Sequence, residues 1–137
     1  MTRVLMIDEN RALTDSVGLQ CLAEGIATRM ADDFCDGVRQ LLETPASLIV
    51  VSASLVRIPP RELAQLFDTL TPGVPVVVRV DGAASMDEEV RFEVEGFRVV
   101  RKPFDVQELL MKGETPPARR VALSPAAAAA ALEALCR

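Results

Sequence analysis

Histidine is absent from the 137 residues of this chain. Its absence excludes histidine phosphotransfer, histidine-based general acid–base catalysis and any metal site with a histidine ligand from this chain alone. No apolar run reaches the roughly 18 residues that a membrane-spanning helix needs. The first residues lead directly into a strand-like run, without the apolar core of a signal peptide. We therefore expect a cytoplasmic protein that makes no membrane contact.

Cysteine is scarce, and its spacing is uninformative. The three cysteines, Cys21, Cys35 and Cys136, are odd in number and form no C-x-x-C pair. Such a set is more typical of reduced thiols than of a disulfide framework or a zinc site. We expect Cys21 and Cys35 to be small residues of the core.

Basic charge is also in short supply. The formal net charge is -5, whereas a nucleic-acid surface needs clustered positive charge. Residues 8–11, which follow the first apolar run, contain no glycine-rich phosphate loop. These features argue against a nucleic-acid partner and against a dinucleotide or flavin site of the usual kind.

What the chain does contain is an alternation of short β-branched apolar runs with segments of helical periodicity. It is 50% hydrophobic, and its length suits one domain with a short tail. The alternation predicts an α/β fold with a doubly wound, five-stranded parallel sheet in the order 2-1-3-4-5. The expected strands are residues 4–7, 26–31, 48–51, 74–80 and 97–100. We expect N-caps at Asn10, Ser85 and Asp105 for the first, fourth and fifth helices.

The composition changes after Gly113. Prolines in residues 113–124 favour an extended linker. Ser124 and Pro125 then provide the N-cap and first turn of an added, alanine-rich C-terminal helix in residues 125–137. Leu132 and Leu135 could pack against the chain's own fifth helix or against a second subunit, and a partner-recognition helix or a disordered end stays open. Residues 1–112 form the main domain.

Parallel strands bring their carboxyl ends to one edge of the sheet. Five polar residues follow predicted strands and should share that edge: Asp8, Glu9, Ser52, Asp81 and Lys102. Such edges are where ligands bind in doubly wound folds. We therefore expect the functional site of the main domain to lie here.

Two motifs carry a resemblance to a known family. They are Val-Leu-Met-Ile-Asp-Glu-Asn at positions 4 to 10 and Arg-Lys-Pro-Phe-Asp at positions 101 to 105. With the order of strands, they make residues 1 to about 112 resemble a receiver domain (CheY-like, flavodoxin-like fold) of bacterial two-component response regulators. In that family two acids after the first strand hold Mg²⁺, an aspartate after the third accepts phosphate, and a lysine before proline pairs with it. Asp8, Glu9 and Lys102 match these roles.

Three departures from the family pattern indicate a degenerate, pseudo-receiver domain. Ser52 stands where the phospho-acceptor aspartate is expected, and a serine hydroxyl with no adjacent base cannot replace that carboxylate. Val80 stands where the family uses a serine or threonine to bind the phosphoryl group. Val99 stands at the aromatic switch position. The resemblance and its departures predict a non-enzymatic protein that works independently of phosphorylation.

The retained residues of the degenerate site have competing explanations. Asp8 and Glu9 could hold Mg²⁺ weakly, although the third carboxylate ligand is missing, and we expect no other cofactor. The alternative that we favour is structural, with Lys102 pairing with Asp8 or Glu9. Asp81, beside Gly82, is predicted to be a turn residue and not a phospho-acceptor.

Without phosphorylation, the expected function is protein–protein interaction. We predict an adaptor or regulator in bacterial signal transduction, with a protein partner and with a homodimer as an open option. By resemblance, the default surface is formed by the fourth helix, fifth strand and fifth helix. Further candidates are Leu132 and Leu135 of the tail and Leu55, Val56 and Ile58 of a loop stiffened by two prolines, which either form a partner patch or fold over the emptied pocket.

Two rival functions remain open at this stage. The first is an atypical Mg²⁺-dependent phospho-switch that uses Asp8 or Asp81. The second is a small-ligand sensor that uses the pocket left by the missing acceptor.

Overall fold

A computed structural model describes residues 3–101, 107–109 and 124–136, and it contains one parallel five-stranded sheet. The strands lie in the order β2-β1-β3-β4-β5, which confirms the predicted topology and fold class. Their bounds are β1 Arg3–Ile7, β2 Ala27–Ala31, β3 Leu48–Ser52, β4 Val76–Val80 and β5 Arg98–Arg101.

The three central strands are buried on both faces because helices cover both sides of the sheet. Every residue of β3 and β4 is buried, as are the last four of β1. Long runs of valine, leucine and isoleucine are typical of such strands. By contrast, β2 forms an edge and is mostly exposed, in keeping with its weaker apolar pattern.

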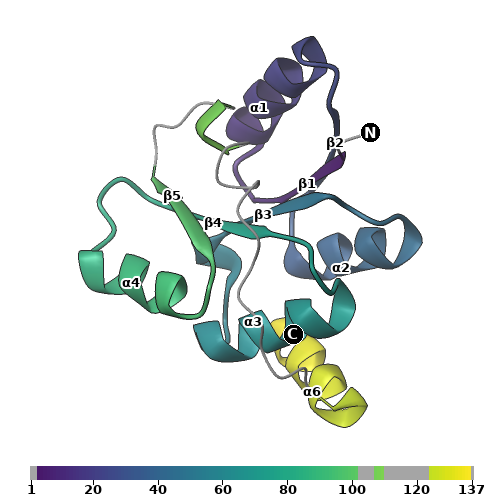
Figure 1. Ribbon diagram of the computed structural model, residues 1–137, viewed down its shortest axis with the longest axis vertical. Coiled ribbons are helices and arrows are strands. Elements are labelled where there is room, and N and C mark those ends of the chain that lie inside the picture. Colours follow the sequence, from purple (N-terminus) through teal and green to yellow (C-terminus); the bar gives the residue numbers. More distant parts are fainter. Residues whose placement is uncertain (1–2, 102–106, 110–123, 137) are drawn as a thin grey trace.

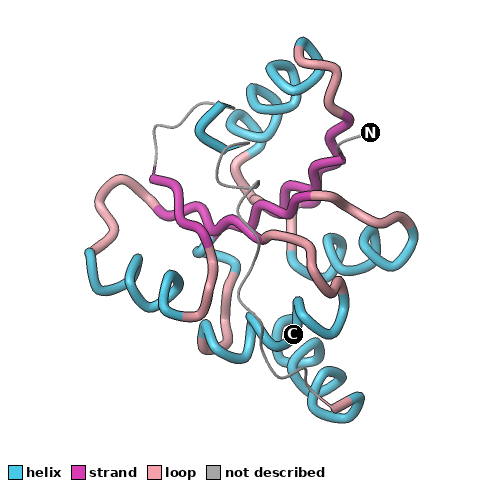
Figure 2. The backbone as a smooth tube through the Cα atoms, viewed as in Figure 1, coloured by secondary structure: helices cyan, strands magenta, loops and turns pink. Residues whose placement is uncertain are grey.

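Helices lie on the two sides of the sheet in unequal numbers, as Figures 1 and 2 show. The α-helices are α1 Arg11–Ala23, α2 Phe34–Glu43, α3 Pro60–Leu70, α4 Met86–Val94 and α6 Pro125–Leu135, and a short 3₁₀ helix, η1, spans Ala53–Leu55. One side carries α1 and the helical residues 107–109, and the other carries α2, α3 and α4, with α6 outside them (Figure 1). Within the described parts of the chain, no helix is long and apolar enough to cross a membrane.

Side chains that alternate along the strands divide the core into two clusters. The larger cluster joins Leu5, Ile7 and Val51 to apolar residues of α2, α3, α4 and α6. The smaller one lies under α1 and includes Met6 and Val50. A residue an even number of positions after Met6 in β1, or after Val50 in β3, points to the same face and therefore lies on the α1 side. This parity decides which side chains meet at the sheet edge.

The predicted helix starts are confirmed wherever the structure describes them. The side chains of Asn10, Ser85 and Ser124 accept hydrogen bonds from backbone N–H groups three residues ahead, at 3.1, 3.1 and 3.2 Å. Each bond satisfies an N–H that has no partner inside its helix. The predicted cap Asp105, most of the fifth helix and linker residues 113–123 lie outside the described residues.

The C-terminal helix docks within its own chain. In α6, Ala128, Ala131 and Leu135 are buried and Leu132 is partly buried in the larger core cluster. The helix lies against α3 and α2, whereas most of the fifth helix, the neighbour that the sequence suggests, lies outside the described residues. Small alanine side chains allow α6 to approach these two helices closely.

The expectation that all three cysteines are reduced is wrong. A disulfide joins Cys35 in the first turn of α2 to Cys136 at the C-terminal cap of α6. The two cysteines lie 101 positions apart in the sequence and meet only because α6 docks beside α2. Cys35 is therefore a half-buried disulfide residue and not a core thiol. Cys21 is buried and free, as expected.

Two helical glycines provide a matched test of how tightly the helices pack on the sheet. A Cβ at Gly37 in α2 would lie 2.5 Å from Cδ1 of Ile7, which is fully buried. We expect Gly37→Ala to lower the free energy of unfolding by about 1–3 kcal/mol through overpacking. A Cβ at Gly18 in α1 would meet only the flexible end of Met30, at 2.7 Å. Gly18→Ala should be neutral or stabilising by up to about 1 kcal/mol, as measured by urea unfolding, and an equal loss in both variants would contradict this account.

Candidate functional site

The carboxyl ends of β1, β3 and β4 bring together three buried polar side chains. Asp8 and Ser52 are each 1% exposed, and Arg79 is 3% exposed. All three lie on the α1 side of the sheet, because each follows by two positions a residue of the smaller core cluster: Met6, Val50 and Val77. The parallel register also places Ser52 directly beside Arg79.

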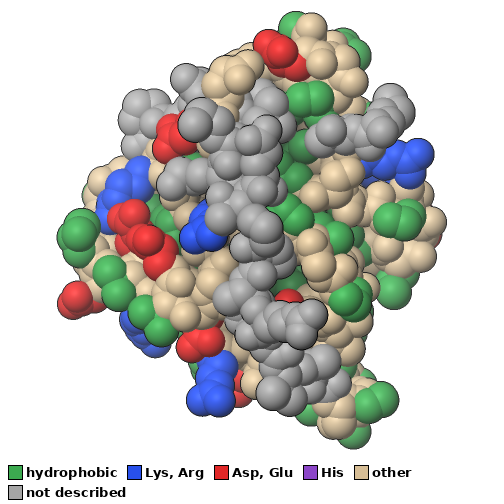
Figure 3. Space-filling view, in the orientation of Figure 1, with side chains coloured by type: hydrophobic (Ala, Val, Ile, Leu, Met, Phe, Trp, Pro, Cys, Tyr) green, Lys and Arg blue, Asp and Glu red, His purple; other side chains and the backbone are tan. Residues whose placement is uncertain are grey.

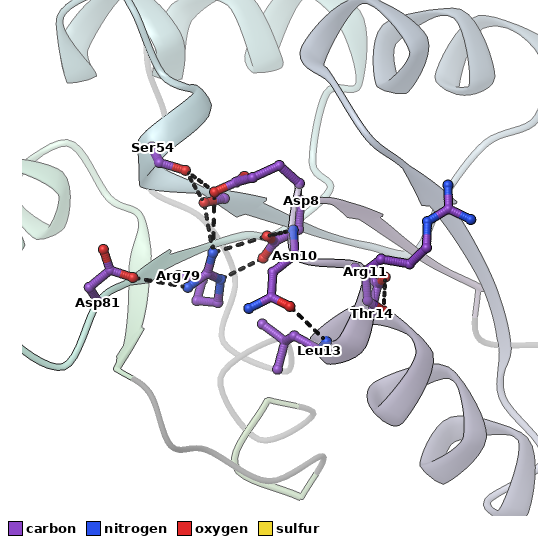
Figure 4. A network of polar contacts seen from close by, with 10 residues as sticks. Asp8, Asn10, Arg11, Leu13, Thr14, Ser54, Arg79 and Asp81 are labelled. Carbon is purple, nitrogen blue, oxygen red and sulfur yellow. Dashed lines mark hydrogen bonds and ion pairs between the residues drawn. The ribbon is translucent and has the colours of Figure 1, made fainter.

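Arg79 occupies the centre of this site (Figure 4). Its Nε donates to Asp8 Oδ2 at 2.5 Å and its Nη2 donates to Asp8 Oδ1 at 3.0 Å. Its Nη2 also donates to Ser52 Oγ at 2.9 Å. Two parallel N–H···O bonds between a guanidinium and a carboxylate fix both groups in one orientation. Asp8 therefore has both of its oxygens engaged by a cation supplied by β4.

More exposed polar groups surround this buried pair. Glu9 Oε1 lies 3.8 Å from Arg79 Nη2, and Asp81 Oδ1 lies 3.4 Å from Arg79 Nη1. Ser54 in η1 donates a hydrogen bond to Glu9, and its hydroxyl lies 2.7 Å from that of Ser52. A continuous hydrogen-bonded path thus runs from Arg79 through the two serines to Glu9.

Backbone geometry helps to hold Asp8 in place. The N–H of Asn10 donates to Asp8 Oδ1 at 2.9 Å, and the side chain of Asn10 caps α1. The turn from β1 into α1 is therefore tied to the same carboxylate that receives Arg79. Disturbing the ion pair should affect the start of α1 as well as the sheet edge.

The charges at the site reinforce one another. Burial alone would raise the pKa of Glu9, but the hydrogen bond from Ser54 and the positive charge of Arg79 outweigh it and hold that pKa below its ordinary value. Burial alone would lower the pKa of Arg79. Hydrogen bonds and charge from Asp8, with smaller contributions from Glu9 and Asp81, outweigh that effect and raise it. Arg79 is charged at every accessible pH.

The structure places most of the predicted site residues at the sheet edge where the predicted topology puts them. Asp8, Glu9, Ser52 and Asp81 do meet at one edge (Figure 4). The side chain of Asp81 is 76% exposed, and its carbonyl accepts a hydrogen bond from Ala84 N in the turn after β4, as a turn residue should. Lys102 lies outside the described residues.

Val80 and Val99 lie in the core. Both are buried in the larger cluster, on the side of the sheet opposite α1. Neither side chain can donate or accept a hydrogen bond. A side-chain hydrogen bond from either position to a group at the sheet edge is therefore impossible.

Sequence reasoning missed Arg79, although a signal was available. Residues 74–80 were interpreted as an apolar strand, yet Arg79 is a charged residue inside a run of valines. A charged side chain in a strand buried on both faces needs a partner of opposite charge. The parity of β4 and its place beside β3 lead from Arg79 to Ser52 and Asp8. Among the described residues, Arg79 is the cation bound to Asp8, and the pairing of Lys102 with Asp8 or Glu9 stays a prediction.

The loop after β3 folds against the body of the protein. Leu55, Val56 and Ile58 are partly buried and pack on the larger core cluster. Val56 and Ile58 also line a pocket of about 370 Å³ that reaches Phe92 of α4. They pack on the side of the sheet opposite α1, and the two alternatives from the sequence, a partner patch or a cover over the emptied pocket, stay predictions.

The site does not fit a divalent cation. Mg²⁺ needs several oxygen ligands from carboxylates and water, but a guanidinium already binds both oxygens of Asp8 and lies within 4 Å of Glu9. In the described ranges, no three cysteine or acidic side chains form a group that could hold a metal ion. Positive charge is thus already built into the place where the receiver family binds its metal.

The fold is shared with solved response-regulator structures. No family model matches the sequence, and no curated protein matches it significantly. A beryllofluoride-activated NtrC4 receiver domain dimer is 20% identical, with a TM-score of 0.70 over 98% of this chain and 99% of that one. A Burkholderia pseudomallei response regulator with a phosphorylated aspartic acid, a calcium ion and citrate is 22% identical, with a TM-score of 0.72 over 84% of this chain and 68% of that one.

A third solved structure has the same fold. The receiver domain protein (CheY-like) from Methanospirillum hungatei JF-1 is 24% identical, with a TM-score of 0.69 over 82% of this chain and 90% of that one. At these identities the comparisons show the fold. The chain has the five-stranded architecture of receiver domains, with α6 added at the C-terminal end.

The ion pair between Arg79 and Asp8 yields a stability prediction. Arg79→Met leaves a buried carboxylate without its partner, so we expect the free energy of unfolding to fall by about 3–5 kcal/mol. Adding Asp8→Asn should recover part of this loss, because it removes the stranded charge and keeps an acceptor for Asn10 N–H. Arg11→Met is the control: it breaks the exposed pair with Asp32 and should cost less than about 1 kcal/mol. Similar losses for Arg79→Met and Arg11→Met in urea unfolding would contradict a buried, structural pair.

Glu9 yields a pH prediction. Because its pKa is lowered in the folded protein, ionised Glu9 adds stability above its unfolded pKa, and that stability is lost as the pH falls through the folded value. The side chain is nearly half exposed, so we expect Glu9→Gln to cost less than about 1 kcal/mol at pH 7. This difference from the wild type should shrink from about pH 4.5 downward. Denaturant unfolding of both proteins across pH measures it, and a difference that grows at acid pH would contradict the assignment.

Proposed function

We propose that this chain is a receiver-like protein-interaction module that works without phosphorylation, as an adaptor or regulator in bacterial signal transduction. The observation that carries the proposal is the guanidinium of Arg79, which is bound to Asp8 and Ser52 at the edge where receivers react. A phosphorylated receiver gains charge at this edge only transiently. Here the polar contacts are permanent parts of the fold.

Ser52 is unsuited to accept a phosphoryl group. Its hydroxyl needs a base to become a nucleophile. The carboxylate of Asp8 already accepts two bonds from Arg79, and that of Glu9 accepts a hydrogen bond from Ser54 and lies within 4 Å of the same guanidinium. Ser52 is also buried, so the active site of a kinase cannot enclose it in the folded protein. Both direct phosphotransfer and serine phosphorylation are therefore disfavoured at this position.

The route from the site to the surface is also altered. In receivers, by resemblance, a hydroxyl after the fourth strand and an aromatic residue in the fifth transmit phosphorylation. Val80 and Val99 occupy those positions and are packed in the core. Neither side chain could form a hydrogen bond in response to a change of charge at the edge. These two valines support a single resting conformation of the module.

The rival functions are less compatible with this geometry. Asp8 is buried in an ion pair and so cannot act as an exposed phospho-acceptor. Asp81 is exposed, and its carboxylate pairs with Arg79. Among the described contacts, no second carboxylate accompanies Asp81. A small-ligand sensor needs an empty pocket at the edge, whereas Arg79 and the two serines fill that position with mutual hydrogen bonds.

An exposed apolar stripe on α4 supports the interaction part of the proposal. Met86, Val90 and Val94 recur every fourth residue, so they lie on one face of the helix, and all three are exposed. Hydrophobic side chains appear on the surface over α4 in Figure 3. This helix belongs to the surface that the receiver resemblance suggests for partner binding.

The phosphorylation part can be tested by restoring the acceptor. We expect wild type and Ser52→Asp to gain no phosphoryl mass with acetyl phosphate and Mg²⁺, because Arg79 remains on Asp8. The double variant Ser52→Asp/Arg79→Met removes the guanidinium and should gain a Mg²⁺-dependent thermal shift from its cluster of carboxylates. Ser52→Asp/Arg11→Met is the matched control and should behave like Ser52→Asp. Intact-mass spectrometry and thermal unfolding with and without Mg²⁺ provide the measurements.

One result would overturn this proposal directly. If the wild-type protein formed a stable phosphoryl adduct that disappeared in Asp8→Asn, the chain would be an atypical Mg²⁺-dependent switch. A Mg²⁺-dependent thermal shift of Ser52→Asp alone would show that Arg79 does not block the site.

The proposed interaction surface on α4 can be tested with two matched double variants, one on α4 and one on α1. Met86 and Val94 of α4 are 71% and 74% exposed, and Leu19 and Leu22 of α1 are 69% and 72% exposed. We expect Met86→Ser/Val94→Ser to lose a partner, or a self-association, that Leu19→Ser/Leu22→Ser retains. Affinity capture with quantitative mass spectrometry, together with light scattering of the pure proteins, makes the comparison. Equal retention by both variants would remove α4 from the proposed interface.

A further inference from the structure

The disulfide between Cys35 and Cys136 fastens α6 to the receiver-like body. Cys35 lies in the first turn of α2, directly after the buried Phe34. Cys136 caps the C-terminal end of α6, and it is exposed. A pocket of about 200 Å³ opens beside the bond and is lined by both cysteines, Asp33 and Arg57. A thiol reagent can therefore approach the disulfide from solvent.

The other contacts of α6 are modest. Its buried residues are Ala128, Ala131 and Leu135, so two of the three contribute only a methyl group. Pro125–Leu135 is a helix of 11 residues, and alanine-rich helices of this length are marginal in water on their own. The docked position of α6 should therefore depend on the covalent bond at its end.

The rest of the domain has a core of its own. The smaller core cluster contains no residue of α6, and most of the larger cluster comes from the sheet, α2, α3 and α4. Phe34 and Phe67 pack against each other with ring centroids 5.8 Å apart. Loss of α6 should thus uncover part of the α2–α3 surface without unfolding the sheet.

We propose that Cys35 and Cys136 form a redox latch that controls whether α6 covers the α2–α3 surface. In the oxidised form the disulfide holds α6 in place. A dithiol reductant opens it: one thiolate attacks a sulfur of the bond and forms a mixed disulfide, and the second thiolate then displaces the protein sulfur. The reductant leaves as a disulfide, and Cys35 and Cys136 together gain two electrons and two protons. Both the helix and the surface beneath it then become available.

The third cysteine serves as an internal control. Cys21 belongs to α1, is fully buried in the smaller core cluster, and is free. It is therefore shielded from reagents that reach Cys136. A redox response that persists in Cys21→Ala and is absent from Cys35→Ser and Cys136→Ser would be specific to the latch.

Hydrogen exchange measured on the full chain tests the proposal. Under oxidising conditions, alkylation in denaturant followed by intact mass should show one internal disulfide and one thiol. Addition of dithiothreitol should make the backbone amides of α6 exchange at least about tenfold faster, while those of β1, β3 and β4 stay protected. Oxidised Cys35→Ser and Cys136→Ser should already show fast exchange in α6, and Cys21→Ala should match the wild type.

Each other outcome overturns the latch. Three alkylated cysteines after oxidation would mean that the bond does not form, and covalent dimers on a non-reducing gel would place it between chains. Unchanged exchange in α6 on reduction would show that packing alone holds the helix. Loss of protection throughout the sheet would make the disulfide a structural staple and not a switch.

Discussion

The buried ion pair between Arg79 and Asp8 is the interaction on which this sheet edge depends. It joins β4 to the turn between β1 and α1, and through Ser52 it includes the end of β3. Burying either charge without the other is strongly unfavourable, whereas the bidentate pair satisfies both. The strand ends are thus locked together by charge at the position where receiver domains keep a cluster of acids open to metal.

In the phosphorylation-independent function proposed above, this arrangement makes the departures from the receiver pattern consistent with one another. Once a guanidinium is buried beside Asp8, a metal ion has no place there, and an acceptor carboxylate at position 52 would have no metal to assist it. In the same proposal, Val80 and Val99 have no phosphorylation to transmit, and both are buried in the larger core cluster. A single buried cation makes serine at position 52, valine at 80 and valine at 99 mutually consistent.

The fold and half of the site were predictable from the sequence, for physical reasons that differ between residues. Strand order, helix starts and the gathering of Asp8, Glu9 and Ser52 follow from local patterns and from the geometry of parallel sheets. The partner of Asp8 was missed because Arg79, although visible as a charged residue in a run of valines, is connected to Asp8 only through side-chain parity and the register between strands. The Cys35–Cys136 bond was missed because no local pattern records where α6 docks.

The same bond changes the connectivity of the molecule. It links positions separated by 101 residues, so most of the polypeptide lies within one covalent ring. A single cut of the backbone inside that ring leaves the fragments joined, and they separate only when the disulfide is also broken. The oxidised protein can thus be nicked at a surface loop and remain one molecule, whereas the reduced protein would separate into pieces on denaturation.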